Sequence, residues 1–192
     1  MNKIIYVLDN NCSKDYNYNI VEDTIIYHFS INGSSNVNIN LVTENVKLYY
    51  YYSNINYDDN SFNIIINHKK DNTSSELINH GVNVNNKKLD YYVNGVVPKN
   101  SNKCICNQEN EIINLSDGKS TICPNLIIDN YDVNANHGAY IGKFSKDKLF
   151  YLMSRGISYE EANKLLLGGF LIPSDSIDMK KINDFLEEIN RI

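Results

Sequence analysis

Asn36-Val-Asn-Ile-Asn-Leu-Val42 places an apolar side chain at every second position, with asparagine between them. A period of two sends successive side chains to opposite faces of an extended chain, so this stretch predicts a half-buried β-strand. Similar stretches, rich in β-branched and aromatic residues, recur between clusters of Asn, Ser, Asp and Gly, which form turns. They are Thr24–Phe29, Val46–Tyr52, Phe62–Ile66, Leu89–Val93, Ile112–Leu115 and Leu126–Ile128. An all-β region is therefore expected from Ile4 to about Gly142.

The pattern alone leaves the arrangement of these strands open. No long stretch of this region has helical periodicity, so a doubly wound α/β sheet, which needs crossover helices, is disfavoured. A sandwich, a barrel and a β-helix are all compatible, since regular recurrence suits both hairpins and the turns of a solenoid. Only Asn32-Gly33 and Asn94-Gly95 signal tight hairpins, which weakly disfavours a meander.

After Gly142 the periodicity becomes helical. Ser145 is expected to cap a first helix over Lys146–Arg155, which Gly156 would stop. Its expected apolar face is Leu149, Phe150, Leu152 and Met153. The capping box Ser158-Tyr-Glu-Glu161 predicts the start of a second helix, which should end near Leu167, before Gly168-Gly169.

A third helix is expected to begin near Ser174 or Ser176, which are suitable capping residues. Apolar residues follow at steps of three and four, as expected for an amphipathic helix with one buried face. They are Ile177, Ile182, Phe185, Leu186 and Ile189. The C-terminal region is thus predicted to be a cap of three short helices on a β body.

Composition narrows the function. The formal net charge of -5 and the sequence pI of about 5.3 argue against nucleic-acid binding, which needs concentrated Lys and Arg. The apolar run Ile4–Leu8 is too short for a signal peptide or a membrane span, which predicts a cytoplasmic protein with no membrane partner. Asparagine is abundant, which we interpret partly as the nucleotide bias of an AT-rich genome.

Common catalytic signatures do not occur in the sequence. It contains no GxSxG elbow, no HExxH helix and no glycine-rich phosphate loop, so we expect a protein that is not an enzyme and binds no nucleotide itself. The groups that remain as candidates for chemistry are four cysteines and four histidines.

The cysteines have no zinc-finger spacing, and without an export signal they are expected to be reduced. Cys104 and Cys106 are two apart in a predicted strand, so both thiols should lie on one face, about 7 Å apart. That separation suits two atoms of a cluster, whereas burial as small apolar side chains is the alternative. Cys123, before Pro124 at the expected start of another strand, has the same two interpretations, and Cys12 is assigned no role.

Histidine is the other potential ligand. His28, His68 and His80 lie in or beside predicted strands, where a hydrogen-bonded or surface imidazole is expected. His137 differs because it lies where the β region gives way to helices. A neutral imidazole is a common metal ligand, so His137 is a candidate ligand at an interface.

Two segments resemble a known family. Pro124–Lys143, which contains His137-Gly-Ala-Tyr-Ile-Gly142, and Leu149-Phe-Tyr-Leu-Met-Ser-Arg-Gly-Ile-Ser158 resemble the C-terminal core of SufB and SufD proteins, and the similarity continues through Glu160–Leu167. A looser similarity extends back through Gln108–Gly118 and Asn94–Val97.

The resemblance implies a right-handed parallel β-helix (solenoid) core over residues 1–143 and a small C-terminal helical domain over 144–192. It implies an iron–sulfur cluster assembly scaffold subunit that holds a transient cluster of iron and sulfide at a subunit interface. The implied partners are a SufB-like paralogue or a second copy, a SufC-like ATPase, and indirectly a cysteine desulfurase or sulfur carrier. The ATPase would dock on the helices through Leu149, Phe150, Tyr151, Met153, Ser154, Arg155 and Gly156.

The resemblance also suggests which side of the scaffold this chain represents. His137 matches the histidine implicated in cluster assembly on the SufD side. SufB paralogues tend to carry Glu at the next position, where this chain has Gly138, so the site is SufD-like. No residue matches the SufB acceptor cysteine, which leaves Cys104, Cys106 and Cys123 as weaker cluster candidates. Two alternatives remain: a structural paralogue that has lost cluster chemistry, and an unrelated solenoid binding module.

Overall fold

The structure is a computed structural model of the 192-residue chain that describes residues 2–173 and 177–192. Its β region consists of strands of seven to eleven residues. The strands are β1 (Lys3–Asn10), β2 (Lys14–Ile20), β3 (Thr24–Ile31), β4 (Ser35–Leu41), β5 (Lys47–Asn56), β6 (Asn60–His68), β7 (Ser74–Asn83), β8 (Lys88–Val97), β9 (Cys104–Asn114), β10 (Lys119–Ile128) and β11 (Val133–Gly142).

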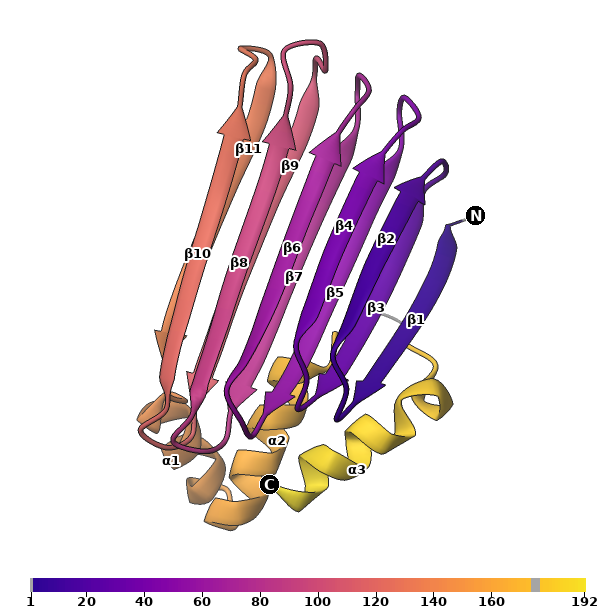
Figure 1. Ribbon diagram of the computed structural model, residues 1–192. Helices are drawn as coiled ribbons and strands as arrows, with labels where there is room; N and C mark the ends of the chain where they lie inside the picture. Colours follow the sequence, from indigo (N-terminus) through magenta and orange to yellow (C-terminus); the bar gives the residue numbers. More distant parts are fainter. Residues whose placement is uncertain (1, 174–176) are drawn as a thin grey trace.

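These strands wind into a parallel β-helix. The odd-numbered strands form one sheet in the order β1-β3-β5-β7-β9-β11, and the even-numbered strands form a second sheet in the order β10-β8-β6-β4-β2. Each turn of the chain adds one strand to each sheet, and each new strand pairs in parallel with the one before it (Figure 1). The predicted β-helix is therefore confirmed, and the sandwich and the barrel are excluded.

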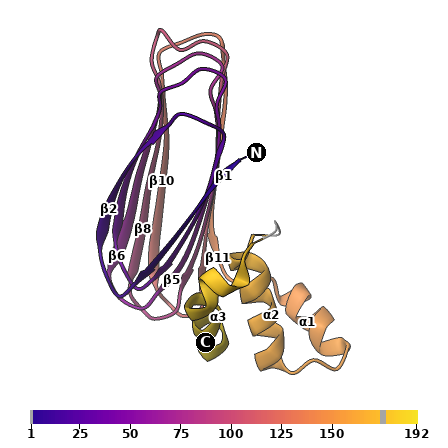
Figure 2. The same ribbon diagram turned by 90° about the vertical axis from the view of Figure 1, so that its right-hand side faces the viewer.

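The turns of the β-helix lengthen toward the C-terminus. Lys3 pairs with Thr24 in the first turn of the odd-numbered sheet, whereas Ser74 pairs with Ile105 in a later one, a step of 31 residues in place of 21. Figure 2 shows the same widening, with the later turns reaching beyond the first ones. The later turns therefore enclose a larger interior.

The expected alternation of Asn36–Val42 is present in β4. Val37, Ile39 and Leu41 are buried between the two sheets, while Asn36 is exposed. The outward asparagines bond to side chains of neighbouring turns along the solenoid: Asn36 Nδ2 donates to Asp15 Oδ1 at 2.7 Å, and Asn63 Nδ2 donates to Asn36 Oδ1 at 2.9 Å. An amide both donates and accepts, so stacked asparagines can satisfy each other from strand to strand. Much of the asparagine content therefore has a structural role.

Helices cover part of the outer face of the odd-numbered sheet. They are α1 (Lys146–Ser154), α2 (Tyr159–Leu171), the 3₁₀ turn η1 (Met179–Ile182) and α3 (Asn183–Arg191). Figure 2 shows them gathered on that side, where α3 contacts β3 and α2 contacts β7. Phe185 anchors α3, with its ring 4.9 Å from that of Phe29. Ile182, Phe185 and Ile189 are buried, which confirms the predicted apolar stripe.

Several helix boundaries differ from the prediction. The capping box of Ser158 and Glu161 is confirmed, but α2 continues through Gly168-Gly169 to Leu171. Each glycine costs a helix about 1 kcal/mol, which is offset here because Leu171 is fully buried and its carbonyl accepts a hydrogen bond from Ser53 Oγ at 2.6 Å. Tertiary packing therefore overrides the stop signal.

Three further local predictions have different outcomes. Ser174 and Ser176 lie outside the described residues, and within them Asp178 caps η1. Asn94-Gly95 lies inside β8 and makes no turn. Ser145 precedes α1 without a side-chain capping bond. Among the described helices, none has both the length and the apolar character needed to cross a membrane.

Candidate functional site

At the N-terminal end of the β-helix, β1 and β2 each have a free backbone edge within the described residues, but side chains of the first turn cover the interior. Tyr16 and Tyr18 stack on each other with ring centroids 6.0 Å apart, and both pack against the main core. Beneath them Asp9 is fully buried and is hydrogen-bonded to Tyr16 and His28. Interior groups at this end are therefore shielded by the first turn.

The C-terminal end is open. In the described part of the chain, β11 pairs only with β9 and β10 pairs only with β8, so both last strands have a free backbone edge (Figure 1). Large apolar side chains are exposed around these edges, namely Ile127, Ile128, Tyr140 and Ile141. Free strand edges bordered by apolar groups are normally covered by a partner, because they otherwise invite aggregation.

His137 lies in the middle of β11, at this open end. It is exposed and pairs in register with Gln108 of β9, while Ala135 pairs with Cys106. Val133 and Ala135 pack inward against the small core around Cys104 and Cys106. Because strand residues alternate between faces, His137 shares that inner face and lies at the mouth of the last turn.

Buried side-chain amides of β9 support β11, the strand that carries His137. Asn110 Nδ2 donates to the carbonyl of Gly138 at 3.0 Å, and Asn110 Oδ1 accepts from Asn79 Nδ2 at 2.7 Å. Gln108 Nε2 donates to the carbonyl of Asn125 on β10 at 3.4 Å, so this side chain bridges the two sheets. The sequence prediction missed these amides. They could have been found from the sequence, because the alternation of β9 places residues 104, 106, 108 and 110 on one face.

The candidate thiols Cys104 and Cys106 are buried below the open end. Cys104 and Cys106 share the inner face, as predicted, but each is only 1% exposed. Burial raises the pKa of the Cys106 thiol to about 11, so the thiol is protonated at neutral pH. Cys104 Sγ lies 3.3 Å from Thr73 Oγ1. Both side chains are therefore positioned as parts of the packed interior.

Cys123 faces a different way. It lies inside β10, not at its start, and pairs with exposed Tyr92 on β8. Its neighbour Ile122 packs against the main core, so alternation places Cys123 on the outer face of the even-numbered sheet. The structure thus brings His137 and the Cys104–Cys106 pair to one face and leaves Cys123 on another.

The other histidines have hydrogen-bonded structural positions, as expected. His28 is buried between Asp9 and Tyr50, and His68 is buried between Thr73 and Ser75. His80 is partly buried, with Nδ1 2.6 Å from the carbonyl oxygen of Phe170. Across residues 2–173 and 177–192, no three His, Cys, Asp or Glu side chains gather closely enough to hold a metal ion.

Thiol burial gives a direct test of these positions. In the native chain, Cys104 and Cys106 are expected to resist alkylation by iodoacetamide, while the partly exposed Cys12 and Cys123 react. Mass spectrometry after brief labelling should show modification at Cys104 and Cys106 only when denaturant is added. Rapid native labelling of Cys106 would show that the last turns open in solution.

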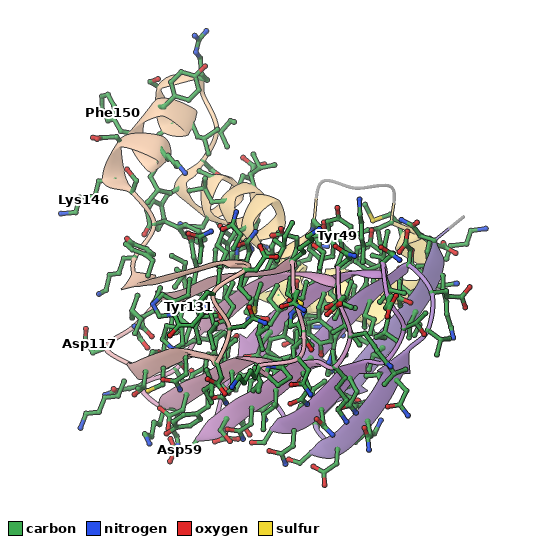
Figure 3. All side chains as sticks on the ribbon, turned by 90° about the horizontal axis from the view of Figure 1, so that it is seen from above. Tyr49, Asp59, Asp117, Tyr131, Lys146 and Phe150 are labelled. Atoms are coloured by element: carbon green, nitrogen blue, oxygen red, sulfur yellow. The ribbon has the colours of Figure 1, made fainter. Side chains whose placement is uncertain are left out.

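A second exposed surface lies on α1. None of its side chains is buried, although the sequence predicts an apolar face, and Phe150 is 74% exposed. Figure 3 shows Phe150 projecting away from the β-helix. The Arg155 guanidinium lies over the Tyr151 ring at 5.3 Å, and Gly156 ends the helix with a φ of 87°. The other residues predicted to bind a partner, Leu149, Met153 and Ser154, are on the same helix.

Comparison with known proteins identifies relatives. A family model described as SUF system FeS cluster assembly, SufBD core domain, matches residues 12–170. The iron-sulfur cluster assembly protein SufD of Bacillus subtilis is 36% identical over 98 residues, which is 50% of this chain and 22% of that protein. SufBD family proteins of Staphylococcus haemolyticus and Staphylococcus epidermidis are 34% identical over 109 residues, 55% of this chain and 23% of each relative. The matched part thus spans less than a quarter of these relatives.

Proposed function

The chain belongs to the SufBD core family of the SUF iron–sulfur cluster assembly system, and from this membership we propose that it is a SufD-like scaffold subunit. The resemblance drawn from its C-terminal motifs is confirmed by the family match, which removes the alternative of an unrelated binding module. The proposed role is cytoplasmic and non-enzymatic, and it divides the chain into a β-helix core (1–143) and a helical docking domain (144–192).

The observation that carries the proposal is the open C-terminal end of the β-helix. A second SufBD-family chain, either a SufB-like paralogue or another copy, would pair its own strand edges with those of β10 and β11 and cover Ile127 and Ile141. His137 would then lie at the subunit interface. Its imidazole would contribute a nitrogen ligand to a nascent cluster of iron and sulfide, or accept a proton there.

The cluster is cargo in this proposal, and the partner supplies most of its ligands. His137 is one ligand, and the thiols that share its face, Cys104 and Cys106, are buried. Sulfur would reach the complex indirectly from a cysteine desulfurase or sulfur carrier. A SufC-type ATPase would dock on α1, and its ATP-driven movement would open or expose the cluster site.

A structural paralogue that has lost cluster chemistry is the second candidate. Two features favour it: Gly138 supplies no carboxylate beside His137, and the Cys104 and Cys106 thiols are buried. Such a subunit would still bind its partners through the same surfaces. The two candidates therefore differ in iron content and agree in complex formation.

Anaerobic co-purification separates them. The tagged chain would be co-expressed with the SufC-type ATPase and the SufB-type protein of its own organism, and the complex assayed for iron, acid-labile sulfide and a visible spectrum. Stoichiometric iron and sulfide would support the scaffold. A complex without iron would support the structural paralogue, and the absence of any complex would contradict both.

The docking role of α1 is tested within the same experiment. Phe150→Ser should lower ATPase recovery at least about tenfold, because a large exposed anchor of this kind can contribute about 2 kcal/mol or more to binding. Val21→Ser is the matched control, since Val21 is an exposed apolar residue on the turn between β2 and β3. Equal ATPase recovery with both variants would exclude α1 as the docking surface.

A further inference from the structure

Gln108 is one of several buried polar residues in this β-helix, and it is the one that pairs in register with His137. Its side chain is only 4% exposed, and its Oε1 is buried without a hydrogen-bond partner among the described residues. Gln108 pairs in register with Leu77 on β7, one turn earlier, and Leu77 is also buried. This interior position therefore accepts an apolar side chain. A buried polar group whose acceptor is left unused needs an explanation beyond packing.

The surroundings hold the Gln108 amide in place. Its Nε2 donates to the Asn125 carbonyl on the opposite sheet, which assigns the oxygen to the other side of the amide. The absence of a side chain at Gly95 makes space for the Gln108 amide, since a Cβ there would lie 3.0 Å from Gln108 Nε2 and 2.4 Å from Cys106 Sγ. The amide is therefore anchored on its nitrogen side while its oxygen stays available.

The residue next to Gln108 on the following strand is His137. The two are paired in register on adjacent parallel strands, about 4.8 Å apart, and alternation puts them on the same face. Within the described part of the chain, the His137 ring has no hydrogen bond of its own. The Gln108 acceptor and the His137 imidazole therefore lie on one face of adjacent strands at the open mouth, although they are not hydrogen-bonded to each other in the structure.

We propose that Gln108 is a positioning residue: rotation of the exposed His137 side chain brings one ring N–H to the buried Gln108 Oε1, and this hydrogen bond presents the lone pair of the other ring nitrogen to the cargo iron. A ligating histidine usually donates its second N–H to an oxygen of this kind, which fixes both the tautomer and the ring orientation. An amide oxygen accepts the hydrogen bond without taking the proton. This inference rests on the proposed role of His137.

Nitrogen NMR of the His137 ring tests the contact without any cluster. In the full chain at a pH where the ring is neutral, the ring nitrogen shifts should indicate one predominant tautomer. Gln108→Leu, which matches Leu77, should give a mixture of tautomers, and Gln108→Glu, which keeps an acceptor oxygen, should restore one. Gln108→Met provides a second apolar variant should the branched leucine prevent folding. Unchanged His137 shifts in a folded apolar variant would overturn the inference.

Iron loading of the complex supplies the second readout. Gln108→Leu should reduce the iron bound by the co-purified complex about tenfold, the usual effect of removing a ligand's supporting hydrogen bond, while Gln108→Glu retains most of it. The NMR experiment tests the Gln108–His137 contact, and the iron content of the wild-type complex tests the scaffold role, so each hypothesis can be contradicted on its own. A wild-type complex without iron, together with a tautomer change in Gln108→Leu, would support the positioning contact and contradict the scaffold role of the chain.

Discussion

Replacing His137 by alanine is expected to leave a complex that forms normally but holds at most about a tenth of the wild-type iron and acid-labile sulfide. The side chain is exposed at the open end and makes no hydrogen bond within the described residues. Removing it would lose at most the one hydrogen bond proposed with Gln108, so the free energy of unfolding should change by no more than about 1 kcal/mol. The variant would therefore lose bound iron and sulfide while its fold and complex formation remain intact.

The matched control for this variant is Asn136→Ala. Asn136 is adjacent on β11 but faces outward, where its Nδ2 donates to Asn107 Oδ1 at 3.2 Å. Both variants should co-purify with their partners and melt near the wild type by circular dichroism, and only His137→Ala should lose iron. Wild-type iron in the His137→Ala complex would exclude the residue as a ligand and leave the structural paralogue as the remaining candidate.

The strands could be predicted from the sequence because their signal is local. Val37, Ile39 and Leu41 alternate with asparagine, and each is buried as the alternation requires. The β-helix could not be derived in the same way, because the pairing of Lys3 with Thr24 or Ser74 with Ile105 joins residues far apart in the chain. Nothing in either strand alone distinguishes a parallel partner one turn away from an antiparallel neighbour.

The helices show the same division. The capping box at Ser158 and Glu161 is a local contact and was predicted correctly. The predicted end of α2 was wrong because the true end depends on Leu171. This residue is buried against the β-helix, and its carbonyl accepts a hydrogen bond from Ser53, 118 residues away in the chain. A glycine pair is a weak stop signal when a residue shortly after it, here Leu171, is buried in the core.

The candidate site combines both kinds of information. His137 could be singled out by its motif and its place at the end of the β region. Gln108 could not, because its relation to His137 exists only through the register of β9 and β11. Cys123 shows the limit of spacing arguments: Pro124 suggested a strand start, yet proline is tolerated within β10 because β10 is an edge strand.

Buried charge at the other end of the β-helix leads to the largest expected effect on stability. Asp9 Oδ2 accepts from His28 Nε2 at 2.9 Å, and Asp9 Oδ1 accepts from Tyr16 at 2.7 Å and Lys14 at 3.0 Å. Tyr50 completes the network by donating its hydroxyl to His28 Nδ1 at 2.7 Å. A neutral His28 satisfies both of its neighbours, one as donor and one as acceptor.

The protonation states follow from burial and these bonds. Burial alone would raise the pKa of Asp9, but the hydrogen bonds from His28, Tyr16 and Lys14 outweigh it and hold the pKa well below its ordinary value of 3.8. Burial lowers the pKa of His28 from its ordinary 6.5. At neutral pH the network therefore contains an ionised carboxylate and a neutral imidazole.

Asp9→Ala should lower the free energy of unfolding by about 3 kcal/mol at neutral pH, because the buried His28 and the partly buried Tyr16 would lose their acceptor. Asp9→Asn should cost less, since its amide oxygen can accept one of the two bonds. Urea unfolding followed by circular dichroism measures both. The exposed neighbour Asn10 provides the control, and Asn10→Ala should unfold at nearly the wild-type urea concentration.

The dependence on pH distinguishes the ionised carboxylate from packing. A carboxyl group whose pKa is lowered in the folded state contributes stability that is present above its unfolded value of 3.8 and is lost as the pH falls toward the folded value. The lowered pKa of His28 acts in the same direction, since the unfolded chain takes up that proton first as the pH falls below 6.5. This loss occurs in both proteins, because His28 is present in each, so it cancels in the stability difference between wild type and Asp9→Asn. That difference should therefore be constant from about pH 7 to pH 5 and shrink below about pH 4. A difference that stayed the same down to about pH 3 would show that Asp9 stabilises the first turn by shape and neutral hydrogen bonds, without its charge.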